Sequence, residues 1–307
     1  MREIKIKNEI LKNNKTVIKY LSKIYPNLSY GTLQKALRNK DIRINDKKIN
    51  SDCLLNENDN LKVYISDELL FNLPCKLMTI YEDDNILVIY KPQGILSNIE
   101  EINGKENEIL GGQEFTLDDL VKKNLGNYII CHRLDRNTAG IILFAKNKDV
   151  HKEILDGFNK NFIHKEYIAY VACSKFEKDE ETLEKYLVKN STYSYVKIHD
   201  KMVPNSQKII TKYKVLKKDE KKDFAILNVE IPTGKTHQIR AQLSSINHPI
   251  IGDSKYGKNT INKKFKQNKQ LLFAYKLSFS FPSKSPLSYL NNKIIKLDSK
   301  MYDEKIK

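Results

Sequence analysis

A charged loop in the middle of the chain carries the residues best suited to chemistry. The segment CHRLDRNTAG, residues 131–140, places the carboxylate of Asp135 between the guanidinium groups of Arg133 and Arg136. Neighbouring cations favour the ionised form of a carboxylate, and an ionised, partly desolvated aspartate can act as a nucleophile or a base. The same residue types are also typical of a loop closed by ordinary salt bridges. Charge alone leaves both interpretations open.

Two further polar side chains lie in segments with strong periodicity. Tyr167 belongs to EYIAYVA, whose alternation predicts a strand, so its ring either faces a site or packs in the core. Arg240 belongs to HQIRAQLSSI, which predicts a helix with Ile239 facing the core. Arg240 is about 100° around this helix from Ile239 and shares a face with His237. That face either points into a cleft or forms a solvated helix edge.

The remaining candidate motifs are excluded by their spacing. TGKT at 233–236 lacks the upstream glycine of a phosphate-binding loop, because Val229 stands in its place. The six histidines form no i, i+4 pair, the four cysteines lie far apart, and no serine has a G-x-S-x-G context. Dinucleotide motifs are also absent. We therefore expect chemistry that uses neither a metal nor a cofactor.

The net charge favours a polyanionic partner. The chain has 54 Lys and Arg against 38 Asp and Glu, a surplus of +16. Such a field attracts a phosphate backbone, although a Lys-, Asn- and Ile-rich composition is also typical of AT-rich coding sequence. The surplus is local: residues 10–50 contain ten basic and two acidic residues, and residues 254–270 contain six lysines and no acid.

Length and composition indicate a folded, cytoplasmic protein. With 307 residues, 40% of them hydrophobic, the chain can bury a core and is not a disordered one. It has no apolar run of about 18 residues and no signal-like amino terminus, so we expect no membrane partner.

The first 66 residues predict a small α/β module. Apolar residues at helical spacing predict a helix that Pro26 closes, and Ser29 is a suitable N-cap for a second. The string IRINDKKIN predicts two short strands around an Asn45-Asp46 turn, and LKVYI predicts another strand. We place the domain boundaries at residues 1–66 and 77–307, with a linker at 67–76.

From Leu77 onward the pattern predicts mainly short strands with a few helices. We expect an α+β domain with a mixed, mostly antiparallel sheet and flanking helices. Two stretches, Asn98–Glu114 and Lys255–Gln270, are typical of surface loops.

Four strings, in order, resemble the motifs of the RluA-type pseudouridine synthase family across about residues 77–295. CHRLDRNTAG is similar to the family's H-R-L-D-x-x-T-S/A-G loop, whose aspartate attacks the target uridine. The resemblance therefore implies a catalytic role for Asp135, with Thr138 and Gly140 shaping the turn. The other matching strings are KPQG at 91–94, KEYIA at 165–169, and GKTHQIR at 234–240 followed by PIIGDSKYG at 249–257.

The resemblance also implies roles for two partners of Asp135. Tyr167 is expected to contact the uracil ring, and Arg240 is expected to pair with Asp135. The chain departs from the family pattern at Asn98, where a histidine is usual, and at Lys235, where an arginine is usual.

The expected reaction explains these residue types. Isomerisation breaks the bond between uracil and ribose, turns the base, and joins a base carbon to the same ribose carbon. Asp135 can act on the sugar, while the ring of Tyr167 stacks on the base and its phenol oxygen can take the proton from C5. The uridine must leave its stack. The resemblance implies that Arg133, with His132 beside it, contacts the RNA at the vacated position.

The first module resembles the S-four-type (alpha-L) RNA-binding domain. A basic helix running into DIRINDKKIN matches the core of that domain, with Asn-Asp in place of the usual Asn-Gly turn. The alternative is a basic surface without a ligand. The resemblance implies phosphate contacts by five basic residues: Lys35, Arg38, Arg43, Lys47 and Lys48.

The sequence thus predicts an RNA pseudouridine synthase. We expect it to act as a monomer without an obligate protein partner, on structured RNA, with large-subunit ribosomal RNA first and transfer RNA second. One alternative is a non-catalytic RNA-binding or ribosome-assembly factor that retains the synthase fold. Another is an RNA glycosidase or nuclease that uses Asp135. Product analysis separates them, because a glycosidase frees a base, a nuclease cuts the chain, and isomerisation leaves length and mass unchanged.

Overall fold

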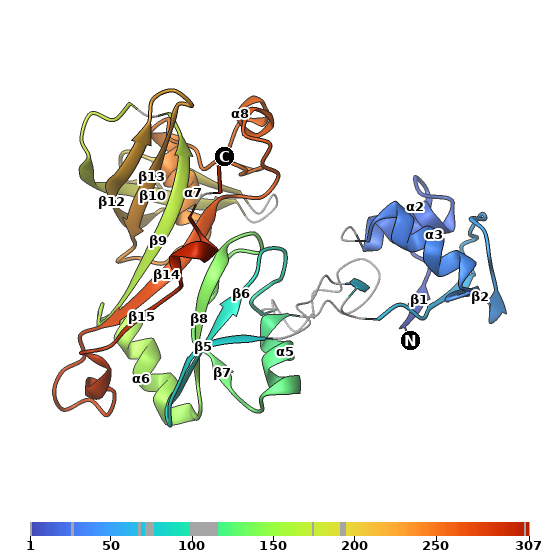
Figure 1. Cartoon of the computed structure of the whole chain (residues 1–307), viewed down its shortest axis with the longest axis horizontal. Coiled ribbons are helices and arrows are strands. Elements are labelled where there is room, and N and C mark those ends of the chain that lie inside the picture. The colour runs from blue at the N-terminus through green and yellow to red at the C-terminus, as the bar shows by residue number, and fades with distance from the viewer. Residues whose placement is uncertain are drawn as a thin grey trace. The chain divides into compact units, whose positions relative to one another are not determined.

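The chain divides into two compact units, shown in Figure 1. The N-terminal unit comprises Met1–Leu77 with Asn98–Leu120, and the large unit comprises Met78–Ser97 with Val121–Lys307. The proposed linker and the loop expected at 98–114 lie largely outside the described residues. The computed structural model describes residues 2–25, 28–66, 69–70, 77–98, 116–173, 175–190, 195–303 and 305–306.

The N-terminal unit packs three short helices against a small antiparallel sheet. The sheet has the strand order β1-β4-β2-β3, and the core contains Leu21, Leu33 and Leu61, all fully buried. Its elements are α1 (Asn8–Leu11), α2 (Val17–Ile24), α3 (Tyr30–Arg38), β1 (Arg2–Lys5), β2 (Ile42–Ile44), β3 (Lys47–Lys48) and β4 (Asn60–Val63).

Local signals in this unit are confirmed. Helix α3 begins after Ser29, whose hydroxyl accepts a hydrogen bond from the Thr32 amide at 3.1 Å. The turn between β2 and β3 has positive φ at both Asn45 (48°) and Asp46 (66°), as expected for a tight hairpin. Both residue types tolerate this conformation, which explains why the usual glycine is dispensable here.

The large unit is built on one long sheet. Its strands are β5 (Met78–Glu82), β6 (Ile86–Lys91), β7 (Ile129–Ile130), β8 (Ala139–Ala145), β9 (Ile163–Ala172), β10 (Glu180–Asn190), β11 (Tyr195–His199), β12 (Gln207–Asp219), β13 (Phe224–Glu230), β14 (Leu272–Phe279) and β15 (Ile294–Lys296). The order is β11-β10-β12-β13-β9-β14-β8-β6-β5, with β15 paired to β14 and β7 to β8.

This topology confirms the predicted fold class. Among the described strands of this sheet the pairs are antiparallel except for β14 and β8, which pair in parallel at Phe273–Ala139 and Ala274–Gly140. Strand β8 is buried along its whole length, as expected for a central strand. The parallel pair is important because the proposed catalytic loop ends where β8 meets β14.

Helices flank the sheet. Helix α6 (Lys148–Asn159) contacts β7, β8 and β9, and α7 (Gln238–Ser245) contacts β10, β11 and β12 (Figure 1). The other helical elements outside the N-terminal α1–α3 are α5 (Leu117–Asn124), α8 (Asn259–Lys264), η1 (Ser288–Leu290) and η2 (Ser299–Met301). The expectation of a pure loop at 255–270 is wrong, because α8 lies inside it.

Helix α7 is more deeply buried than its sequence predicts. Ile239 and Leu243 face the core as expected, but Gln238, Arg240 and Gln242 are buried as well. The two glutamines are satisfied by hydrogen bonds: Gln238 donates to the Ile210 carbonyl at 2.9 Å, and Gln242 to the Leu183 carbonyl at 3.0 Å. The solvated-edge alternative for Arg240 is therefore wrong.

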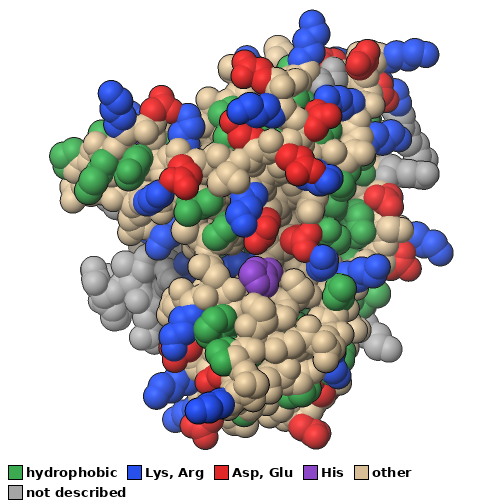
Figure 2. All heavy atoms as spheres, turned by 90° about the vertical axis from the view of Figure 1, so that its left-hand side faces the viewer, with side chains coloured by type: hydrophobic (Ala, Val, Ile, Leu, Met, Phe, Trp, Pro, Cys, Tyr) green, Lys and Arg blue, Asp and Glu red, His purple; other side chains and the backbone are tan. Residues whose placement is uncertain are grey.

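Charges on part of the large unit are balanced. Lys208 contacts Glu184 at 2.6 Å and Lys212 contacts Glu230 at 3.6 Å, both between neighbouring strands. Figure 2 shows one face of the molecule, with positive and negative side chains interspersed. The cationic surplus of the chain is therefore not gathered on this face.

Candidate active site

The loop between β7 and β8 presents Asp135. A hydrogen bond from the Thr138 amide to the Asp135 carbonyl (3.0 Å) closes a turn, and the chain then enters β8 at Ala139. Gly140 has φ of 136°, and a Cβ there would lie 2.3 Å from the Ala274 carbonyl oxygen. Only glycine permits this approach of β8 to β14, which explains the glycine at the end of the motif.

Lys91 anchors the loop from the end of β6. Its side chain is fully buried, and its ammonium donates hydrogen bonds to the carbonyls of Ile95 (2.8 Å), Arg136 (3.0 Å) and Pro92 (3.1 Å). Burial lowers the pKa of Lys91 to about 7. The KPQG string is therefore part of the structure that supports the loop carrying Asp135.

Arg240 joins Asp135 to a second carboxylate. Its Nη1 donates to Asp135 Oδ2 at 2.8 Å, while Nε and Nη2 donate to the two oxygens of Asp253 at 2.7 and 3.0 Å. Burial disfavours the charge of Arg240, but the hydrogen bond and charge of Asp253, helped by Asp135, raise its pKa. The pKa of Asp253 is lowered: burial opposes its charge, and the Arg240 contacts outweigh that effect.

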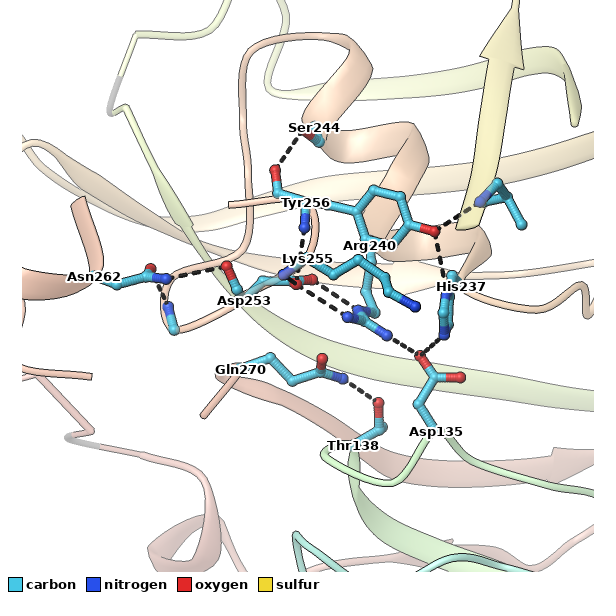
Figure 3. A network of polar contacts seen from close by, with 12 residues as sticks. Asp135, Thr138, His237, Arg240, Ser244, Asp253, Lys255, Tyr256, Asn262 and Gln270 are labelled. Atoms are coloured by element: carbon cyan, nitrogen blue, oxygen red, sulfur yellow. Dashed lines mark hydrogen bonds and ion pairs between the residues drawn. The ribbon is translucent and has the colours of Figure 1, made fainter. Parts of the chain in front are cut away.

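The network leaves one oxygen of Asp135 for chemistry. Oδ2 accepts from Arg240, whereas no hydrogen bond to Oδ1 occurs within the described part of the chain. Figure 3 shows Oδ1 pointing away from the arginine. The Asp135 side chain is 23% exposed. The arrangement fits a carboxylate that is held through one oxygen and reacts through the other.

His237 and Tyr256 complete the polar network on the Arg240 side. His237 Nε2 lies 4.0 Å from Asp135 Oδ2, and its Nδ1 lies 2.9 Å from the Tyr256 hydroxyl. The guanidinium of Arg240 lies 5.2 Å from the centroid of the Tyr256 ring. Sequence reasoning assigned no role to Asp253 or Tyr256, although both lie in the PIIGDSKYG string that it singled out.

Tyr167 is buried beside the same carboxylate. It lies on β9, opposite Val229 of β13 and Ala274 of β14, and is 5% exposed. Burial, followed by the negative charge of Asp135, raises the pKa of its phenol. The site therefore favours the neutral phenol, which suits packing against a nucleobase. A free phenolate that acts as a general base is disfavoured.

The two residues before Leu134 differ in their surroundings. Arg133 is exposed. His132 accepts a hydrogen bond from the Leu143 amide at 3.1 Å and packs edge-on against Phe158. Burial, and then the charge of Lys165, lowers the pKa of His132 to about 3. These contacts give His132 a structural function, and an RNA contact by this residue stays a prediction.

The five basic residues predicted to contact phosphates all lie in the N-terminal unit. Lys35 and Arg38 are exposed on α3, and Lys47 and Lys48 are exposed on β3. Arg43 lies on β2, where its guanidinium stacks over the Tyr64 ring at 4.6 Å. Helix α3 and the β2–β3 hairpin therefore present cations to solvent.

Neither a membrane-spanning helix nor a metal-binding cluster occurs in the described ranges. No helix there has the length and apolar character that crossing a bilayer requires. The same ranges contain no group of three or more His, Cys, Asp or Glu side chains with a metal-binding arrangement.

Comparison with known proteins agrees with the geometry. The sequence model of the family described as RNA pseudouridylate synthase matches residues 85–245. A Mycoplasma capricolum protein, named an uncharacterized RNA pseudouridine synthase, is 30% identical over 304 residues, covering 92% of this chain and 93% of that protein. Ribosomal large subunit pseudouridine synthase C of Rickettsia bellii is 32% identical over 264 residues, covering 79% and 83%.

Solved structures agree on the fold. The human RNA pseudouridylate synthase domain containing 1 superposes with a TM-score of 0.54 at 21% identity, covering 72% of this chain and 82% of that one. The matched family segment contains Asp135, Tyr167 and Arg240. This chain therefore belongs to the RNA pseudouridylate synthase family and is an RNA pseudouridine synthase.

Proposed function

We propose that the chain converts uridines of large-subunit ribosomal RNA to pseudouridine, with Asp135 acting on the ribose of a flipped-out nucleotide. Relatives from Rickettsia bellii and Buchnera aphidicola are named ribosomal large subunit pseudouridine synthase C, the latter 27% identical over 300 residues. The net charge of +16 suits a large RNA substrate.

The observation that carries the mechanism is the 2.8 Å contact between Arg240 Nη1 and Asp135 Oδ2. It fixes the direction of the carboxylate and leaves Oδ1 to meet the sugar. The bond from uracil N1 to ribose C1′ breaks, the base turns, and C5 joins C1′. The proton on C5 leaves and N1 gains one, so that no atom is gained or lost overall.

Tyr167 would hold the base during this exchange. Its ring is buried on β9 close enough to Asp135 for the carboxylate to raise its pKa. A neutral phenol next to the carboxylate provides a flat apolar surface for uracil and a hydroxyl for hydrogen bonding. In this proposal Arg133, which is exposed two residues before Asp135, contacts the RNA that surrounds the extruded nucleotide.

The N-terminal unit would bind the RNA backbone without reading its sequence. We assign residues 1–66 to an S-four-type RNA-binding domain and residues 77–307 to the catalytic domain. The exposed cations of α3 and the β2–β3 hairpin support this assignment, because they suit phosphate contacts that position RNA. We further propose that the chain acts as a monomer in the cytoplasm, where ribosomes assemble.

A pseudouridine map of total RNA from cells with and without the gene tests the proposal. We expect one or more ribosomal RNA sites to disappear with the gene and to return with the wild-type gene but not with Asp135→Asn. Loss of transfer RNA sites alone would move the substrate assignment to transfer RNA. An unchanged map, together with RNA binding by the purified chain, would favour the ribosome-assembly alternative.

A further inference from the structure

His237 lies between Tyr256 and Asp135 in the polar network of the site. We propose that it is a positioning residue for Asp135, held by Tyr256 in the tautomer that directs a ring N–H at the carboxylate. The inference rests on the proposed role of Asp135 and extends it.

The Tyr256 hydroxyl fixes the direction of the first hydrogen bond. The Val196 amide donates to this oxygen at 3.0 Å, and an amide can only donate. The hydroxyl therefore directs its own proton elsewhere, and His237 Nδ1 lies 2.9 Å away. Among the described residues, His237 Nδ1 is the one acceptor within hydrogen-bond distance of this hydroxyl, so we assign Tyr256 as the donor and Nδ1 as the acceptor of the contact drawn in Figure 3.

An imidazole that accepts at Nδ1 carries its proton on Nε2 when it is neutral. Nε2 faces Asp135 Oδ2 at 4.0 Å, on the same oxygen that Arg240 holds. This distance is longer than a hydrogen bond, but hydrogen bonds of catalytic groups often tighten only when substrate is bound. A small rotation of the carboxylate would therefore place two donors on Oδ2 and present Oδ1 to the ribose.

Burial of the ring favours this neutral donor. Burial is the main effect that lowers the pKa of His237. The nearby cations Arg240 and Lys255 lower it further, whereas Asp135 and Asp253 raise it. A neutral N–H orients Asp135 without adding a second full positive charge beside it.

The ring of Tyr256 is itself held firmly. It stacks on Tyr195 with centroids 4.8 Å apart, and the Ser244 hydroxyl donates to its backbone carbonyl at 2.8 Å. His237 has a left-handed backbone (φ 56°) at the start of α7, which fixes where its side chain departs. The Tyr256 hydroxyl and the His237 ring, which connect the Val196 amide to Asp135, are therefore held in fixed positions.

Three variants of the full-length chain separate positioning from structure. His237→Asn tolerates the left-handed backbone and keeps an amide near the Nδ1 position, but it removes the donor that faces Asp135. His237→Gln restores a donor near the Nε2 position. Tyr256→Phe keeps the ring and removes the hydroxyl that selects the tautomer. The matched control is Ser245→Ala. Ser245 lies on the same helix, and in the described structure its hydroxyl donates a hydrogen bond only to the Gln242 carbonyl.

We expect His237→Asn to lower the single-turnover rate at saturating RNA about tenfold or more, with RNA affinity within about twofold of wild type. His237→Gln should recover a large part of that loss, and Tyr256→Phe should lower the rate several-fold. Ser245→Ala should match the wild type. An unchanged rate for His237→Asn, or no recovery with His237→Gln when both variants melt at the same temperature, would overturn the inference.

Nitrogen-15 NMR of the imidazole in the full chain tests the tautomer without any RNA. We expect unprotonated Nδ1 and protonated Nε2 at neutral pH in the wild type, and loss of this single tautomer in Tyr256→Phe. A proton on Nδ1 in the wild type would refute the inference even in an active enzyme. Absence of pseudouridine from the wild-type reaction would instead refute the proposed function, so the two failures are distinguishable.

Discussion

Arg240 Nη1 lies 2.8 Å from Asp135 Oδ2, although 105 residues separate them in the sequence. The other donors of the same guanidinium are held by Asp253, whose side chain is fully buried. Asp253 fixes the arginine, and the arginine fixes Asp135. The strings GKTHQIR and PIIGDSKYG therefore contribute one charged group each: Arg240, in contact with Asp135, and Asp253, which holds Arg240.

Because Arg240 binds both Asp135 and Asp253, the effect of Arg240→Lys can be predicted. A lysine ammonium cannot serve two carboxylates with the planar geometry of a guanidinium. We expect the single-turnover rate to fall about 100-fold, while RNA affinity stays within a few-fold of wild type. Parallel filter-binding and turnover measurements provide the comparison. A larger loss of affinity than of rate would make Arg240 an RNA contact.

Arg240→Ala should also destabilise the fold. Removing the cation leaves Asp253 buried without its ion-pair partner, and breaking a buried pair in this way costs about 3–5 kcal/mol. Urea titration of the free energy of unfolding measures the loss. The double variant Arg240→Ala with Asp253→Ala should be less destabilised than Arg240→Ala alone, and the opposite order would contradict the pairing.

Gly140→Ala should disrupt the junction of β8 and β14. A Cβ at this position would meet backbone atoms of Ala274 at 2.3 to 2.7 Å, so the parallel pair would have to separate. We expect a loss of stability of about 4 kcal/mol or more and loss of activity with it. Gly126→Ala is the matched control, since Gly126 also has positive φ (119°) but a Cβ there would make only an ordinary contact with the Tyr128 ring at 3.9 Å, and we expect it to cost about 1–3 kcal/mol. Equal effects at the two glycines would show that backbone strain, and not the close approach, is decisive.

His132 should make the protein sensitive to acid. The pKa of its imidazole is about 3 in the folded protein, against about 6.5 in an unfolded chain. Between these values the unfolded state binds one more proton, so the stability from neutral His132 is complete above pH 6.5 and is lost as the pH falls. The loss should reach at most about 1.4 kcal/mol per pH unit. His132→Gln, which can still accept from the Leu143 amide, should show a shallower fall between pH 6 and 4, and equal slopes would refute the assignment.

The N-terminal cations should govern the salt dependence of binding. Substituting both Lys35 and Arg38 with Gln removes two exposed charges on α3, and we expect the slope of log affinity against log salt to fall by about 1.5. The matched control replaces Lys208 and Lys214, which pair with Glu184 and Glu180 on the neighbouring strand. The control should leave the slope unchanged. An unchanged slope for the α3 variant would show that this helix makes no phosphate contacts.

Local features of the fold were predictable from sequence because local interactions determine them. The Ser29 cap and the Asn45-Asp46 turn are examples in the N-terminal unit. In the large unit, the alternation around Tyr167 predicted its strand, and the family resemblance predicted that Arg240 meets Asp135.

The supporting contacts of the site could not be read from the sequence. Lys91 binds the carbonyl of Arg136 across 45 residues, and Tyr256 binds His237 from a different loop. Helical periodicity treats Arg240 as polar and outward-facing, whereas an ion pair with buried Asp253 allows it to lie inside. Such pairings depend on the assembled sheet and on which charges it brings together.

The most direct test of the central claim is the reaction of purified Asp135→Asn with RNA that the wild type modifies. The asparagine keeps the size of the side chain and can still accept from Arg240, so the RNA should bind within a few-fold of wild-type affinity. We predict that no pseudouridine forms during many wild-type turnover times. Pseudouridine formation by this variant at a rate comparable to the wild type would contradict the account.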